Sequence, residues 1–260
     1  MDESNQTQPL VYEPMSLPPR RKLERGAAIQ WLRDGWSYFN RMRGISIAYG
    51  AVFAAIGMLI TLLGLSQPQF ILTFWTGFLL VGPLLAMGLY RIAQLHDRGE
   101  AVQFNNCWTI LRGRLGPVAL FTLLLSLIMI AWIRFSTLIA AVYVGNVAGT
   151  SSFISAMGSA DGVGFLLVLF GVGAVFAVVM FALTAWSLPL VLDARTDFGT
   201  AVVASVKAVI EQPLPMLAWG ALVAGLTIFG MLTFFAGFVV IFPLLGYATW
   251  AGYKELFVRD

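Results

Sequence analysis

Few residues of this chain could do chemistry in an apolar environment, and Arg134 is the most prominent of them. It is the only charged residue within the long apolar stretches of the sequence. At the centre of a bilayer it would cost about 2.5–3.5 kcal/mol on insertion scales. Arg134 lies about 27 Å along the expected helix from Gly116, however, and is therefore expected near the outer face of the membrane that the helix crosses. We favour an arginine that reaches the interface beside Trp132 or pairs with Asp161, the only acidic residue expected on that side, over a site for an anion or a quinone headgroup.

Three prolines are the other candidates for a functional role. Pro83, Pro189 and Pro243 each fall in a long apolar stretch. A proline in a membrane-spanning helix frees a backbone carbonyl and kinks the helix, which suits a hinge or a break that a substrate lines. Proline is also common in membrane helices for packing alone, so we favour static kinks over hinges.

The remaining reactive side chains form no recognisable site. The chain has one histidine, His96, and one cysteine, Cys107. With Asp97 and Glu100 nearby, His96 still makes a poor metal site, and a lone cysteine forms no intramolecular disulfide. There is no Gly-rich phosphate loop, no nucleophile elbow and no histidine inside an apolar stretch to bind haem. We therefore expect no catalytic residue, no metal, no cofactor and no enzymatic activity.

The elements that carry these residues are predicted to be membrane-spanning helices. Hydrophobic residues make up 59% of the 260 residues and charged residues only 11%, against about 45–50% and 25% in ordinary soluble domains. A crossing needs about 20 apolar residues, so the last uncharged stretch is long enough for two. The sequence predicts an all-α bundle with six spans, at residues 44–65, 70–90, 116–141, 164–192, 214–232 and 235–253.

The positions of the basic residues predict the orientation. All but one of the 16 lysines and arginines fall before the first span, after the last span or in connections on the same side, and Arg134 is the exception. The positive-inside rule then places both termini in the cytoplasm. Residues 1–26 are polar, rich in proline and basic, so we expect a disordered cytoplasmic tail followed by a single transmembrane domain over residues 27–260. Its basic run fits acidic lipid headgroups better than nucleic acid.

The cytoplasmic connections contain further helices with an apolar stripe. The expected stripes are Ile29, Leu32, Trp36 and Phe39; Phe104, Trp108, Leu111 and Leu115; and Val202, Val206 and Val209. Such helices either lie flat on the membrane surface or pack on the ends of the spans, and the spacing does not separate the two. Together with similar Gly-Phe and Pro-Leu-Leu segments at 77–85 and 237–245, they suggest three repeated hairpins, an arrangement typical of some transporters.

Several of these segments resemble a known family. The stretch Gly77-Phe-Leu-Leu-Val-Gly-Pro-Leu-Leu-Ala-Met-Gly-Leu-Tyr90, together with residues 187–193 and 242–250, is similar to the DUF2189 family of predicted bacterial integral membrane proteins. The likeness runs from about Arg25 to Phe257. The resemblance implies a bacterial inner-membrane location and no particular reaction. It also implies a histidine at the position of Tyr247, which this chain lacks.

Two functions remain open from the sequence. The leading expectation is a structural or accessory component of a membrane complex, with a respiratory complex as one candidate, because charges are almost absent from the spans. The alternative is a transporter of a small or apolar solute, which the repeats and the three prolines favour. The expected partners are the lipid bilayer and other membrane protein subunits, and no nucleic acid.

Overall fold

The structure is a computed structural model that describes residues 17–64, 71–102, 115–143, 160–194 and 196–257. These ranges are helical and contain no strand, which confirms the all-α fold class. The helices are α1 (Ala27–Arg41), α2 (Arg43–Gly64), α3 (Ile71–Asp97), α5 (Leu115–Tyr143), α7 (Ala160–Thr184), α8 (Ser187–Asp193), α9 (Phe198–Glu211), α10 (Pro213–Leu232) and α11 (Phe238–Phe257).

Five of the six expected spans coincide with helices that are long and apolar enough to cross a membrane. They are α2, α3, α5, α7 continued by α8, and α10. The sixth expected span, 235–253, corresponds to α11 but is not among the five. Helix α11 is as long as α10, but its second half carries Lys254 and Glu255. The expectation of six spans is therefore not confirmed by length and composition.

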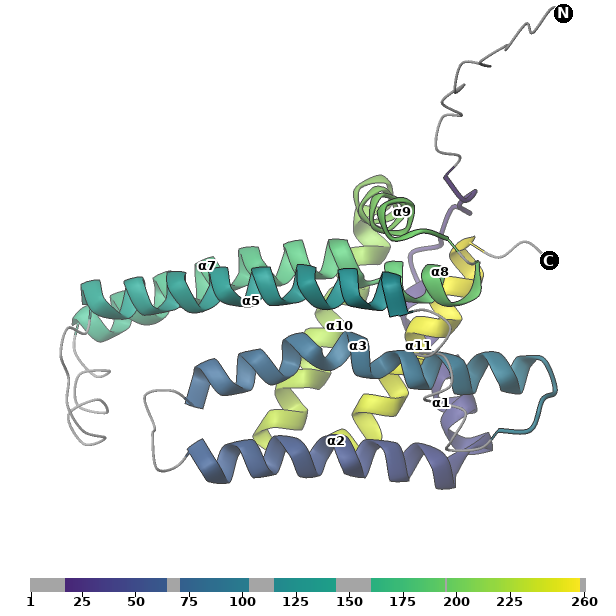
Figure 1. The fold of residues 1–260 in the computed structure, drawn as a ribbon, viewed down its shortest axis with the longest axis horizontal. Coiled ribbons are helices and arrows are strands. Elements are labelled where there is room, and N and C mark those ends of the chain that lie inside the picture. Colours follow the sequence, from purple (N-terminus) through teal and green to yellow (C-terminus); the bar gives the residue numbers. More distant parts are fainter. Residues whose placement is uncertain (1–16, 65–70, 103–114, 144–159, 195, 258–260) are drawn as a thin grey trace, which may run out of the picture.

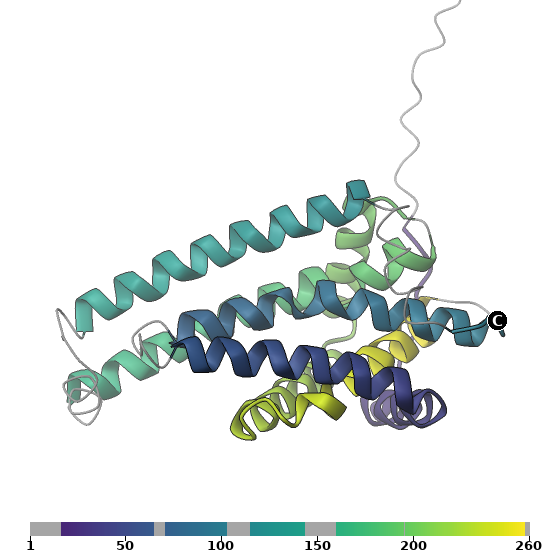
Figure 2. The ribbon, with the colours of Figure 1, turned by 60° about the horizontal axis from the view of Figure 1, so that its bottom comes forward.

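The long helices form three hairpins, α2–α3, α5–α7 and α10–α11 (Figure 1). Helices α2 and α3 run side by side, as do α5 and α7, while α10 and α11 run obliquely to these four (Figures 1 and 2). The described ends of the chain lie with α1, α8 and α9 at one end of the molecule (Figure 1). Because the third hairpin is oblique, the expected arrangement of three equivalent hairpins is not confirmed.

Helix α11 is the centre of the bundle. It packs against α1, α2, α3 and α10, and most of its residues are buried. The tightest crossing is with α2 at Gly50, where a β-carbon would lie 2.1 Å from the carbonyl oxygen of Val239. Only a residue without a side chain lets the two backbones approach this closely, which is how membrane helices gain packing contacts.

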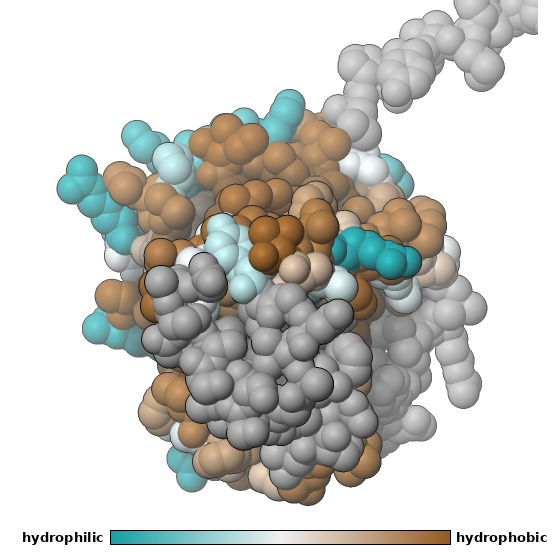
Figure 3. Space-filling model, turned by 90° about the vertical axis from the view of Figure 1, so that its left-hand side faces the viewer, coloured by the Kyte–Doolittle hydropathy of each residue, from teal (hydrophilic) through white to brown (hydrophobic). Residues whose placement is uncertain are grey.

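The outlying α5–α7 hairpin is the most exposed part of the structure. Only 11% of the residues in the most apolar segment of each of these spans are buried, against 65% in α3. Exposed side chains such as Leu127, Phe135, Leu167 and Phe170 project away from the other helices. Seen from the end where the hairpins turn, the described surface is mostly apolar, with hydrophilic residues mainly towards its edges (Figure 3). A surface this apolar is unusual for a soluble monomer and is suited to lipid.

The helices at the terminal end pack as part of the core. In α1 the buried face holds Ala28, Trp31 and Phe39, and this helix packs against α11. Of the expected stripe, Phe39 is buried, whereas Ile29 and Trp36 are 55% and 47% exposed, so only part of the stripe packs on the bundle. The buried face also holds Gly35, and a β-carbon at Gly35 would lie 2.8 Å from the backbone nitrogen of Ala248 in α11. Close packing against α11 therefore sets this face, and an apolar pattern does not encode that neighbour. The stripe at 104–115 lies outside the described residues, apart from the backbone of Leu115.

The start of the described chain is bound to the bundle. Of the expected tail at 1–26, residues 17–26 are described. Arg20 forms a bidentate ion pair with Glu211 of α9, and the backbone amide of Arg21 donates to the carbonyl of Leu256 at 2.9 Å. These contacts hold residues 17–26 along α9 and α11.

Candidate functional sites

The expected site residues do not meet in one place. Arg134 is exposed on α5, more than two turns before that helix ends, a position that suits an arginine reaching the interface. Asp161 lies in the first turn of α7, but its side chain is outside the described residues, so the expected pair with Arg134 stays a prediction. Pro83, Pro189 and Pro243 lie on three different helices.

The helix break before Pro189 is repaired by a side chain from α9. The backbone amide of Trp186 donates to Ser205 Oγ at 3.2 Å, and Ser205 Oγ donates to the carbonyl of Ala182 at 2.8 Å. Ser205 thus stands between two backbone groups that an unbroken helix would join directly. Because Ser205 is fully buried, this geometry favours a static kink at Pro189. Helices α3 and α11 continue through Pro83 and Pro243 without a break.

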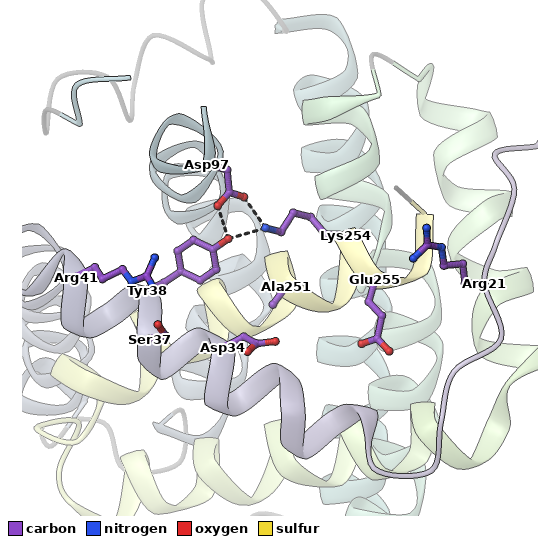
Figure 4. A pocket seen from close by; sticks show the side chains of 9 residues that line it. All are labelled: Arg21, Asp34, Ser37, Tyr38, Arg41, Asp97, Ala251, Lys254 and Glu255. Carbon is purple, nitrogen blue, oxygen red and sulfur yellow. Dashed lines mark hydrogen bonds and ion pairs between the residues drawn. The ribbon is translucent and has the colours of Figure 1, made fainter. Parts of the chain in front are cut away.

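A polar cluster joins three helices at the terminal end. The Asp97 carboxylate, at the end of α3, accepts hydrogen bonds from the Tyr38 hydroxyl of α1 and from Lys254 Nζ of α11 at 2.7 Å (Figure 4). It also accepts one from Trp250 Nε1 of α11 at 2.9 Å. Lys254 Nζ also donates to the Tyr38 hydroxyl at 2.7 Å. We call Tyr38, Asp97, Trp250 and Lys254 the Asp97 cluster.

The Asp97 cluster borders an open pocket of about 450 Å³. The pocket is also lined by Asp34, Glu255, Arg21 and Arg41, so three acidic side chains face three basic ones (Figure 4). Burial and the hydrogen bond to Asp97 raise the pKa of Tyr38 to about 12, which keeps the phenol protonated near neutral pH. Protonated Tyr38 donates to a carboxylate that already holds an ammonium group, so the cluster is suited to tying helices together and has no free base or nucleophile.

A second acidic residue repeats this arrangement. Asp193, at the end of α8, accepts from Gln94 Nε2 at 2.7 Å, from Tyr253 Oη at 3.0 Å and from Arg98 at 3.3 Å. The second half of α11 therefore supplies donors to the acids that end both α3 and α8. This use explains why that half of α11 is too polar to resemble an ordinary span.

The other side chains singled out in the sequence are packed into the same end. The ring of His96 meets the ring of Tyr38 edge-on at 5.8 Å. Tyr247 is fully buried, and its hydroxyl lies 3.0 Å from Ser46 Oγ of α2. Within the described residues, no group of three His, Cys, Asp or Glu side chains is arranged to hold a metal. Cys107 lies outside the described residues.

A separate apolar cavity lies among α3, α7, α10 and α11. It measures about 190 Å³, and Gly82, Pro83, Ala86, Val223 and Thr227 are among the residues that line it. Pro83 is thus an expected site residue that borders this cavity. Sequence reasoning did not find the cavity or the Asp97 cluster, because each is formed by residues from helices far apart in the chain.

Comparison with known families agrees with this architecture. Residues 71–193 match the DUF2189 family, described as a predicted integral membrane protein. The match confirms the resemblance over α3, α5, α7 and α8 and supports an integral membrane protein with several spans. The DUF2189 match assigns no activity. No curated protein and no solved structure matches the chain significantly.

Proposed function

We propose that the chain is a six-span protein of the bacterial inner membrane with both termini in the cytoplasm. The placement of α11 supports a sixth crossing, because this helix returns from the α10 turn to the end where α1 lies (Figure 1). Its polar half is bound to Asp97 and Asp193, so burial within protein compensates for its low hydropathy. The sequence positions of the basic residues, all but one of which are predicted on the side of the termini, support a cytoplasmic location for this end.

The topology can be tested by cysteine labelling. We expect a variant without the native cysteine, Cys107→Ser, to be a background for single substitutions Ser4→Cys, Ser66→Cys and Val258→Cys. A membrane-impermeant maleimide added to spheroplasts should label the position-66 cysteine at once, and the cysteines at positions 4 and 258 only after lysis. Labelling of position 258, but not of position 4, in intact spheroplasts would mean an odd number of crossings and would exclude a spanning α11.

We further propose that the protein is an accessory subunit of an inner-membrane complex, with a respiratory complex as one candidate. The observation that carries this proposal is the α5–α7 hairpin, which extends away from the bundle with little of its surface buried. Its side chains offer a long apolar face for another membrane subunit. The polar groups of the Asp97 cluster are satisfied by one another, which suits a structural role better than catalysis.

Purification from native membranes tests the accessory role. Tagged protein extracted in mild detergent should carry a partner at fixed stoichiometry, identified by mass spectrometry. The double substitution Leu167→Ala and Phe170→Ala, at residues 70% and 71% exposed on α7, should release that partner. The matched change of Val52 and Leu59 to alanine, at exposed positions of α2, should not. Recovery of the chain alone, or only with copies of itself, would contradict an accessory role.

The second candidate is a transporter of a small or apolar solute, and the cavity beside Pro83 favours it. An apolar solute could occupy a cavity of this size between the two membrane faces. Purified protein in proteoliposomes would have to accelerate the flux of such a solute over protein-free vesicles. A rate equal to that of protein-free vesicles across a solute panel would remove this candidate.

A further inference from the structure

The cavity among α3, α7, α10 and α11 has a lining without charge. The residues around it include aromatic rings, aliphatic side chains, glycine and proline, together with a tyrosine and three threonines, and none of them is ionisable at neutral pH. A polar or charged ligand would lose its hydration there and gain no ionic partner. The lining therefore selects for an uncharged, apolar occupant.

Three of the four hydroxyl groups of the lining, those of Thr184, Thr249 and Tyr90, are already engaged. Thr184 Oγ1 donates to the carbonyl of Met180 and Thr249 Oγ1 to that of Leu245, each at 2.8 Å. Thr249 also hydrogen-bonds the Tyr90 hydroxyl. These hydroxyls satisfy one another and the helix backbone, so they leave mainly methyl groups and ring faces for an occupant.

Gly82 shows that the cavity is a real gap in the packing. This glycine is buried and lines the cavity, yet a β-carbon added to it would meet no atom within 4 Å. At Gly50 the same substitution would meet the Val239 carbonyl oxygen at 2.1 Å. Gly50 therefore serves a close helix crossing, whereas Gly82 leaves space. The groups around such unfilled space make fewer dispersion contacts than groups in a close-packed interior.

We propose that this cavity binds a hydrocarbon group taken up from the bilayer. The cavity is partly open to its surroundings, and for a bundle of membrane spans those surroundings are lipid. Its volume of about 190 Å³ exceeds the ~150 Å³ of an apolar cavity known to accept benzene, but is below the ~300–1,000 Å³ of sites that enclose whole drug-sized molecules. It accommodates a single ring or a short stretch of acyl chain.

This proposal extends the transporter hypothesis by naming the class of ligand, and it does not depend on the evidence for an accessory role. Binding of a hydrocarbon group is necessary for transport of an apolar solute through this cavity, but it is not sufficient. A bound lipid chain that never leaves would make the cavity a structural lipid site. Binding and flux are therefore measured separately, so that failure of one can be distinguished from failure of the other.

The test is site-resolved photolabelling of the full chain in lipid nanodiscs. One arm uses a phospholipid with a diazirine on its acyl chain, and the other uses free trifluoromethyl phenyl diazirine, a ring-sized apolar probe. We expect labels on Pro83, Thr227 and Thr249, read by mass spectrometry. Labelling by the lipid alone would make an acyl chain the occupant, and labelling by the free ring alone would make it a small solute. Absence of label from all three residues in both arms would overturn the proposal.

Two glycine substitutions separate the cavity from the general lipid surface. Gly82→Leu fills the open space and should abolish labelling of Pro83, Thr227 and Thr249. The control Gly225→Leu adds the same side chain at an exposed position of α10 where a β-carbon also meets no atom, and should leave labelling unchanged. Exposed Phe170 should be labelled equally in all variants, as the internal reference. Unchanged cavity labelling in Gly82→Leu would overturn the proposal.

A second variant tests the same cavity in case Gly82→Leu does not fold. If Gly82→Leu does not give a folded protein, Ala86→Leu narrows the same cavity from the next helical turn, and the same loss of labelling is expected. Flux of the small apolar probe is then measured in proteoliposomes with the same preparations. Cavity labelling without flux would exclude the transporter hypothesis and leave the hydrocarbon-binding site supported. Absence of cavity labelling would not bear on the accessory role, which the purification experiment tests.

Discussion

Gly50→Leu is expected to prevent the protein from folding. The β-carbon alone would lie 2.1 Å from the Val239 carbonyl oxygen and 2.7 Å from its carbon, and both are backbone atoms of α11. A flexible side chain could turn away, but the backbone of a helix cannot, so α11 would have to move as a whole. Because α11 also packs on α1 and α3, the cost should exceed the ~4–5 kcal/mol that marks the most severe substitutions.

Size-exclusion chromatography and thermal unfolding in detergent would measure this effect. Gly50→Leu should give aggregated protein or none, and Gly50→Ala, which adds the clashing β-carbon alone, should also lose most of the folded protein. Gly44→Leu, on the same helix, is the matched control, since a β-carbon there meets no atom within 4 Å. If Gly50→Leu unfolded at the temperature of the Gly44→Leu control, the close crossing of α2 and α11 would be wrong.

Asp97→Ala should produce the second largest loss of stability. The substitution leaves the Trp250 Nε1–H group, on a residue that is 2% exposed, without its acceptor, and Lys254 without its counter-ion. A buried donor that loses its partner costs about 1–3 kcal/mol. Exposed ion pairs contribute less, about 0–1 kcal/mol, and the Asp97 and Lys254 side chains are 27% and 38% exposed. We therefore expect a total loss of about 1–4 kcal/mol.

A second acidic residue in the same pocket provides the control. Asp34 borders this pocket, but its carboxylate accepts an exposed hydrogen bond from Gln30, four residues away on the same helix. Asp34→Ala should change the free energy of unfolding by less than about 0.5 kcal/mol. Both variants would be compared by reversible unfolding in detergent, with tryptophan fluorescence as the readout. Equal stability of the two variants would show that the Asp97 cluster does not hold the three helices together.

The residues of the candidate sites are visible in the sequence, but their neighbours in the fold are not. In the sequence, Asp97 stands out only as a neighbour of His96. Two of its hydrogen-bond partners in the structure, Tyr38 and Lys254, lie 59 and 157 positions away. Pro83 was singled out because prolines are visible in an apolar stretch. Pro83 borders the cavity among α3, α7, α10 and α11, whereas Pro189 does not. This difference depends on which helices surround each proline, and no local sequence pattern encodes those neighbours.

The sequence by itself determined the helical class, the approximate limits of the long helices and the membrane environment. These properties follow from local composition, because a span must satisfy its own backbone hydrogen bonds and present apolar side chains along about 20 residues. The segregation of basic residues likewise predicted an orientation from the chain alone.

Only the tertiary structure decided which apolar face turns inward. Gly50 with Ala54, and Gly82 with Ala86, are the same pattern of small residues four positions apart. Yet Gly50 lies at a tight helix crossing and Gly82 at an open cavity. In water an apolar stripe identifies the buried face of a helix. In a membrane, lipid and protein interior are both apolar, so hydropathy does not distinguish the two faces and packing between distant helices makes the choice.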